Sequence, residues 1–282
     1  MAQQTTTKTA PMPNFIERFD KHQRYQHILL IVSIFFLCLT GFPIKYADAA
    51  WARAIVAMFQ GFDHMFTVHL VSAVCMILSG IYHIVWIVLH FKNHGPKWAM
   101  LPSFKDFKDA WHHGLYLIGV RKARPQYDRY TYLEKFEYFA VIYGILLMGL
   151  SGFVLWFPDV AAWIMPRWVI DMFRIAHSNE ALVCLFALII GHFFWVHFNP
   201  DAFPTSSVWY NGKISKQHLQ EEHPLEYARL AELYGETGDN GDNLHAEQVK
   251  PPKGRLFMLV ELLIYVAFVI VLLATFIPAL LA

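Results

Sequence analysis

Five apolar segments, each about as long as a membrane is thick, limit what this chain can fold into. They cover residues 27–47, 65–91, 134–157, 174–198 and 256–280. About 20 consecutive apolar residues are enough for an α-helix to cross a bilayer. A mean hydropathy of +0.34 and a charged fraction of 16% agree with such segments. The sequence therefore predicts an all-α integral membrane protein, a bundle of five transmembrane helices.

The apolar segments also predict how the chain is organised. We expect an N-terminal segment (1–26), a four-helix core (27–198) with a 92–133 loop, a second loop (199–255) and a fifth helix (256–282). Residues 103–118 are amphipathic and are expected on the membrane surface. Residues 217–235 are charged and expected to be helical. No alternating pattern predicts a strand.

Lysine and arginine residues gather on alternate sides of the predicted spans. Residues 1–26 hold four, residues 92–135 hold nine and residues 199–255 hold six, whereas the two remaining loops share only four. The positive-inside rule places the N-terminus and both long loops in the cytoplasm, and five spans then leave the C-terminus outside. This asymmetry is explained by membrane topology, so it indicates no nucleic-acid partner.

Several common functional motifs are missing from the sequence. The N-terminal residues have no apolar core of a cleavable signal peptide. The three cysteines, Cys38, Cys75 and Cys184, form no CxxC or CxxCH motif, so covalently attached c-type haem is not expected. HExxH and GxGxxG are also missing, which argues against a hydrolytic zinc site or a dinucleotide site.

Histidines lie in or at the ends of the predicted spans, where an imidazole is costly unless it has a partner. There are six: His27, His69, His83, His177, His192 and His197. His69 and His83 are 14 residues apart, and His177 and His192 are 15 apart. Each pair thus lies near one face of its helix, about 21–22 Å apart along it. His69 and His177 share the outer level of the membrane, and His83 and His192 share the inner level.

Two stacked layers of facing imidazoles predict two haem groups with histidine axial ligands inside a four-helix bundle. Zinc is a rival, but structural zinc needs its ligands in one cluster, which residues four helical turns apart do not form. His27 also lies at the inner level, so His27, His83 and His192 compete for two axial positions. His197 faces another side of its helix.

Two arginines lie beside these histidines. Arg24 precedes His27 by three residues and Arg174 precedes His177 by three. Both are candidates for contacts with haem propionates, and snorkelling to the interface explains them equally well. A second class of function remains, a transporter or channel that uses the histidines as proton relays or metal sites. That class favours interrupted spans and internal repeats, and the first four spans are interrupted little.

Several stretches resemble the cytochrome b membrane subunit of respiratory formate dehydrogenases and nickel-iron hydrogenases. The resemblance covers about residues 15–225, and these stretches carry it: FIERFDKHQRYQHILLIVSIFFLCLTG, VHLVSAVCMILSGIYHIVW, YLEKFEYFAVIYGILLMGLSGFVLWFP and AHSNEALVCLFALIIGHFFWVHF, followed by NGKISKQHLQEEHP. It implies a protein of the bacterial inner membrane that carries two haem b groups. It pairs His69 with His177, and His27 with His192.

The resemblance also implies partners. Electrons would pass between an extracytoplasmic redox subunit, an iron–sulfur protein or a multihaem cytochrome c, and a quinone, menaquinone or ubiquinone. Such a chain is a subunit of an oxidoreductase complex and has no substrate of its own. The family's Asn and Gln at the quinone pocket are Thr131 and Glu134 here, and Glu134 is the candidate quinone residue. A stand-alone cytochrome b561-like carrier is the alternative that needs no partner subunit.

Overall fold

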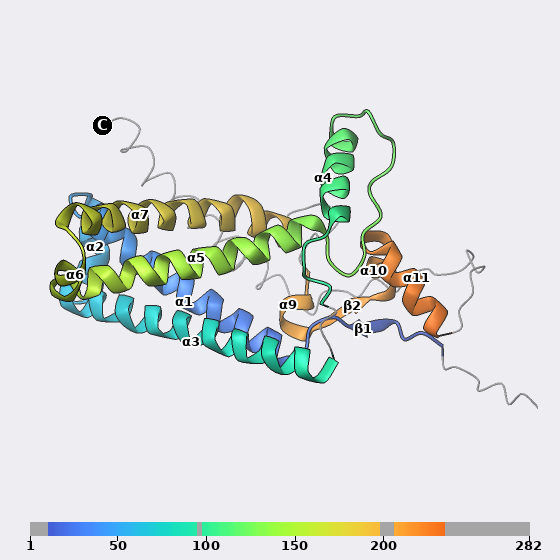
Figure 1. Cartoon of the computed structure of the whole chain (residues 1–282), viewed down its shortest axis with the longest axis horizontal. Coiled ribbons are helices and arrows are strands. Elements are labelled where there is room, and N and C mark those ends of the chain that lie inside the picture. Colours follow the sequence, from blue (N-terminus) through green and yellow to red (C-terminus); the bar gives the residue numbers. More distant parts are fainter. Residues whose placement is uncertain (1–10, 95–97, 198–205, 235–282) are drawn as a thin grey trace, which may run out of the picture. The chain divides into compact units, whose positions relative to one another are not determined.

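The computed structural model describes residues 11–94, 98–197 and 206–234, which are almost entirely helical. The chain divides into two compact units. Within the described residues, we call 21–93, 140–197 and 206 the bundle unit, and 11–20, 94, 98–139 and 207–234 the loop unit. Figure 1 follows the elements along the chain.

Four long helices carry the apolar segments (Figure 1). They are α1 (Lys21–Lys45), α3 (Phe62–His94), α5 (Tyr132–Trp156) and α7 (Arg167–Phe186), and α7 continues through the π-helix η1 (Ala187–Phe193) into α8 (Phe194–His197). Candidate membrane spans cover Lys21–Lys45, Phe62–Asn93, Tyr132–Trp156 and Arg167–His197. These confirm the first four predicted spans, with ends that differ by a few residues. The predicted fifth span, 256–280, lies outside the described residues.

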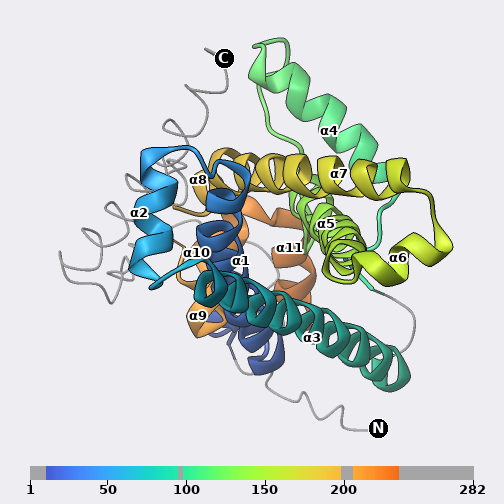
Figure 2. The same ribbon diagram turned by 90° about the vertical axis from the view of Figure 1, so that its left-hand side faces the viewer.

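Side chains between the long helices hold the bundle unit together. Phe42 of α1 is buried in one cluster with Leu185 of α7 and Ile189 of η1. On another side α3 and α5 approach closely at Gly80, where an added Cβ would lie 3.7 Å from Ile145. Small residues at such contacts let membrane helices pack closely. Figure 2 shows the four helices from the end at which the two short connecting helices lie.

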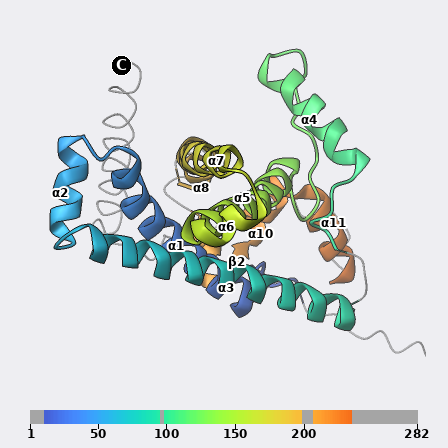
Figure 3. The same ribbon diagram turned by 60° about the vertical axis from the view of Figure 1, so that its left-hand side comes forward.

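Short helices fill the two short loops of the bundle unit. Helix α2 (Ala50–Met58) connects α1 to α3, and α6 (Pro158–Ile164) connects α5 to α7 (Figure 3). The hydrophobic pattern did not predict them, because nine and seven residues are too few for a helical period to stand out. The bundle unit therefore consists of two helix–short helix–helix halves.

The loop unit corrects two predictions made from the sequence. A short antiparallel pair, β1 (Phe15–Glu17) and β2 (Lys213–Ser215), is present where no strand was expected. Three residues are too few for alternation to show. The predicted helix over 217–235 is in fact two, α10 (Lys216–Glu222) and α11 (Pro224–Leu233), because Pro224 starts a new helix. The unit also holds α4 (Phe104–Leu117) and α9 (Val208–Asn211).

Candidate functional site

His69 on α3 is held by a hydroxyl group on α1. Its Nδ1 lies 2.9 Å from Thr40 Oγ1, and this oxygen donates its own proton to the Phe36 carbonyl oxygen at 2.6 Å. Because the hydroxyl proton is already used, the imidazole must donate through Nδ1–H. The lone pair of His69 Nε2 is then left for another partner. A histidine that ligates a metal has this arrangement, with its other ring nitrogen donating to a fixed acceptor.

His177 on α7 is held in the same way by α5. Ser151 Oγ donates to the Leu147 carbonyl oxygen at 2.6 Å and lies 2.8 Å from His177 Nδ1. His177 therefore also donates through Nδ1 and keeps the Nε2 lone pair. His69 and His177 are close enough to interact electrostatically. Each half of the bundle unit thus contains a histidine whose Nδ1 is held by a hydroxyl group of the neighbouring long helix.

A glycine follows each hydroxyl residue and leaves room for the ring. A Cβ added at Gly41 would lie 3.1 Å from His69 Cε1, and one added at Gly152 would lie 3.2 Å from His177 Cε1. Both distances are shorter than ordinary van der Waals contact, so a larger residue would push the ring away. The contacts assign each glycine a specific neighbour.

At the other end of the bundle unit, His27 of α1 faces His192 of η1. Their ring centroids are 6.1 Å apart, and the ring planes meet at 75°. A metal–nitrogen bond is about 2.0 Å, and the centre of an imidazole lies about 1 Å beyond its nitrogen, so two rings on one iron have centroids about 6 Å apart. The observed separation fits a haem iron between His27 and His192.

His83, the third candidate at the inner level, is held by Gln26 of α1. Its Nδ1 lies 2.7 Å from Gln26 Oε1, an acceptor, so His83 too donates through Nδ1–H. Its ring stacks on Trp86, which stacks on His90. The buried Gln26 Nε2 has no hydrogen-bond partner among the described residues. The inner level therefore holds one facing pair, His27 and His192, and a third imidazole on α3.

The π-helix η1 changes the angle between His177 and His192 around the helix axis. A π-turn accommodates one residue more than an α-helix of the same course. Fifteen residues that include η1 therefore turn about as far as 14 residues of α-helix, which is about 40° short of four turns. That is the offset between His69 and His83 on α3. The two long histidine helices thus carry their histidines in the same relation.

The remaining candidates have these positions. Arg24 lies in the first turn of α1, three residues before His27. Arg174 is exposed and lies 3.6 Å from Asp171 on its own helix. Glu134, in the loop unit, accepts a hydrogen bond from the Thr131 backbone N–H at 2.7 Å and so caps α5. His197 is buried, with its ring centroid 4.4 Å from that of Phe193.

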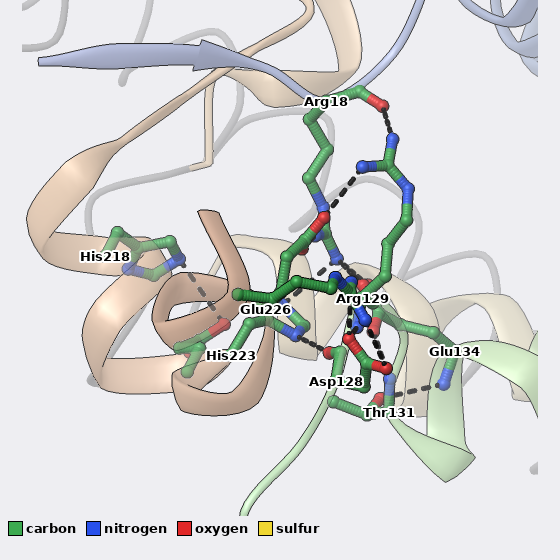
Figure 4. A network of polar contacts seen from close by, with 10 residues as sticks. Arg18, Asp128, Arg129, Thr131, Glu134, His218, His223 and Glu226 are labelled. Carbon is green, nitrogen blue, oxygen red and sulfur yellow. Dashed lines mark hydrogen bonds and ion pairs between the residues drawn. The ribbon is translucent and has the colours of Figure 1, made fainter. Parts of the chain in front are cut away.

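The loop unit contains a buried ionic cluster that sequence reasoning missed (Figure 4). Arg18 and Glu226, each 4% exposed, form an ion pair at 2.8 Å, and Arg129 contacts the other oxygen of Glu226 at 2.8 Å. His223 donates through Nδ1 to the Asp128 carbonyl oxygen at 2.7 Å, and its Nε2 lies 3.1 Å from an Arg18 nitrogen. Burial and the Arg18 charge lower the pKa of His223. These residues are far apart in sequence, so no local pattern indicated the cluster.

Comparison with known families gives one further finding. Residues 18–202 match the model of a family described as prokaryotic cytochrome b561. The matched region contains α1 to α8 and the six histidines in or at the ends of the spans, His27, His69, His83, His177, His192 and His197, and it agrees with the resemblance found in the sequence. A comparison with curated proteins finds no match.

Proposed function

Because the chain belongs to the prokaryotic cytochrome b561 family, it is a multi-pass membrane electron carrier that binds haem b, and we propose that it binds two haems. The single observation that carries this proposal is that histidines pair at both ends of the bundle unit: His69 with His177, and His27 with His192. Thr40 and Ser151 anchor the rings of the first pair, which come from different halves of the bundle unit.

We assign the outer haem to His69 and His177. Thr40 and Ser151 orient the two rings, and Gly41 and Gly152 let the rings lie against the neighbouring helices. The inner haem is assigned to His27 and His192, whose ring separation supports this pair. His83 lies at the same level and is the competing inner ligand. Arg24 and Arg174 are the proposed propionate contacts.

Haem b, when bound, exchanges one electron at a time without needing a proton. The chain orients the imidazoles, surrounds them with apolar spans and sets the distance between them. Because η1 shortens the course to that of 14 α-helical residues, His177 and His192 are about 21 Å apart along their helix. This separation lets electrons cross most of an apolar layer about 30 Å thick.

We further propose that electrons move between an extracytoplasmic redox subunit, an iron–sulfur protein or a multihaem cytochrome c, and the quinone pool. The resemblance found in the sequence supports this role. The quinone is menaquinone or ubiquinone, with Glu134 as its candidate residue. The charge asymmetry supports a bacterial inner membrane with the N-terminus inside and the C-terminus outside.

The test is a reduced-minus-oxidised spectrum of the purified chain, with pyridine haemochrome quantification. We expect a b-type spectrum and two haems per chain. His69→Ala and His177→Ala should each remove the outer haem, and His27→Ala and His192→Ala the inner haem. His197→Ala is the control and should keep both. One haem in the unmodified chain would contradict the two-haem proposal.

A second comparison decides the inner ligand. If His83→Ala removes a haem while His27→Ala keeps both, the inner pair is His83 with His192 and our assignment is wrong. Co-purification of a large extracytoplasmic redox subunit from the native membrane would support the complex. A chain that exchanges electrons with quinone and soluble donors without such a subunit would instead be a stand-alone carrier.

A further inference from the structure

Helix α4 of the loop unit exposes an aromatic face. Phe104 is 87% exposed, Phe107 is 76% exposed and Trp111 is 74% exposed. Their spacing of three and four residues puts them on one side of the helix, which Gly114 continues. Three large aromatic residues exposed together are uncommon on a surface that faces only water. This face therefore has a partner that the chain itself does not supply among its described residues.

The opposite face of α4 is attached to the start of α5. Asp106 pairs with Lys135 at 2.9 Å, and His113 Nδ1 lies 2.9 Å from the Tyr132 hydroxyl. Tyr132 is the first residue of a candidate membrane span. Both contacts are made within the loop unit, so they fix the height of α4. Helix α4 is therefore held beside the first turn of α5, where this candidate span begins.

The charges on α4 are sorted between its two faces. Asp106 and Asp109 are mostly buried and pair with Lys135 and Lys105. The carboxylates are therefore neutralised on the inner side. The exposed residues in and after α4 are apolar or basic: Phe104, Lys105, Phe107, Lys108, Trp111, Leu117, Ile118, Val120, Arg121 and Lys122.

We propose that α4 lies in the surface of the membrane that α5 enters, with its aromatic face among the lipid chains. Lys108, Arg121 and Lys122 then face anionic lipid headgroups. Amphipathic helices with aromatic and basic residues bind bilayer surfaces in this way, and bury their apolar side about 5–10 Å deep. Aromatic rings are also enriched at the membrane–water boundary. The occupant of this face is the lipid bilayer, and this contact does not depend on electron transfer.

The test uses the full haem-loaded chain with a nitroxide label at Gly114→Cys, in nanodiscs of zwitterionic and anionic lipid. An added Cβ at Gly114 has open space around it, so the label leaves the three aromatic residues in place. The matched control is Ala228→Cys, an exposed position on α11 of the same unit. Labelling the unmodified chain in the same way shows how much nitroxide attaches to the native cysteines, Cys38, Cys75 and Cys184. Collisions with oxygen, which prefers lipid, are compared with collisions with a water-soluble nickel complex.

We expect the label at Gly114→Cys to shift toward oxygen relative to the label at Ala228→Cys. Combined Phe104→Ser, Phe107→Ser and Trp111→Ser substitutions should reverse this shift and leave the haem content unchanged. Replacing the anionic lipid by zwitterionic lipid should reduce the shift. A label at Gly114→Cys that is as accessible to nickel as the control would overturn the proposal and assign the face to another occupant, such as a protein.

Discussion

At the scale of single residues, we predict that the hydroxyl groups of Thr40 and Ser151 are needed for tight binding of the outer haem. Thr40→Val and Ser151→Ala remove the acceptor of His69 and His177. The rings would then lose their fixed tautomer and orientation, and loss of such a partner typically lowers metal affinity about 10–100-fold. We expect the outer haem to dissociate first in a haem-transfer assay with apomyoglobin.

A matched control comes from α3. Ser72 is also buried, but its hydroxyl donates only to the Val68 carbonyl of its own helix. Ser72→Ala should therefore release haem at the rate of the unmodified chain. Equal release from the Ser151→Ala and Ser72→Ala variants would show that the hydroxyl does not support the ligand.

The glycines allow a comparison within one helix. Gly152→Ala would place a Cβ 3.2 Å from the His177 ring, whereas a Cβ at Gly149 meets nothing within 4 Å. We expect Gly152→Ala to lower affinity for the outer haem by about tenfold or more, and Gly149→Ala to leave it unchanged. Haem content after purification measures the difference. A loss of haem in both variants would point to a general effect on α5 and not to the ring.

At the scale of elements, we expect a deletion in η1 to be tolerated. Because its π-turn holds one extra residue, deleting Ile190, which faces outward, should leave a regular helix with His177 and His192 in nearly the same relation. We expect this deletion to keep two haems. Inserting one alanine after Ile190 should instead turn His192 by about 100° and remove the inner haem.

The two variants are compared by haem content and by the thermal stability of the chain. Loss of the inner haem in the deletion variant, with the outer haem kept, would mean that the inner site needs the π-turn itself. The explanation from helical register would then be wrong.

At the scale of the whole molecule, the cluster around His223 joins segments that are far apart in sequence. Burial and the Arg18 charge favour the neutral form of His223 in the folded loop unit, where it faces Arg18, Glu226, Glu134 and Asp128. Its folded pKa is below the unfolded value of about 6.5. The unfolded chain therefore takes up the proton first as the pH falls. The contribution of His223 to the free energy of unfolding of the loop unit is therefore complete above pH about 6.5 and is lost progressively below it.

Limited proteolysis of the loop unit between pH 7.5 and 5 tests this dependence. Cleavage should become faster as the pH falls in the unmodified chain. His223→Gln keeps a hydrogen-bonding side chain that does not titrate, so its cleavage should change less with pH. Parallel pH profiles in the two proteins would assign the acid sensitivity to another group.

Much of the bundle unit could be predicted from the sequence, because long apolar runs and helical spacing are local properties. They gave the four described spans and the shared level of His69 and His177 in the bundle unit. The π-turn could not be predicted, because one extra residue in a turn does not change the hydrophobic pattern. The roles of Thr40 and Ser151 could not be predicted either, because each hydroxyl contacts a histidine on another helix. The β1–β2 pair and the Arg18–Glu226 pair depend on contacts across about 200 residues.

The hydroxyl anchors have a consequence for the charge of the outer site. Thr40 and Ser151 are neutral acceptors, so they leave His69 and His177 as neutral imidazoles and add no negative charge. A ferric haem between neutral ligands carries one net positive charge more than the ferrous form, and charge is costly among apolar spans. A haem bound between His69 and His177 would therefore favour the reduced state more than a haem whose histidine ligands are anchored by carboxylates.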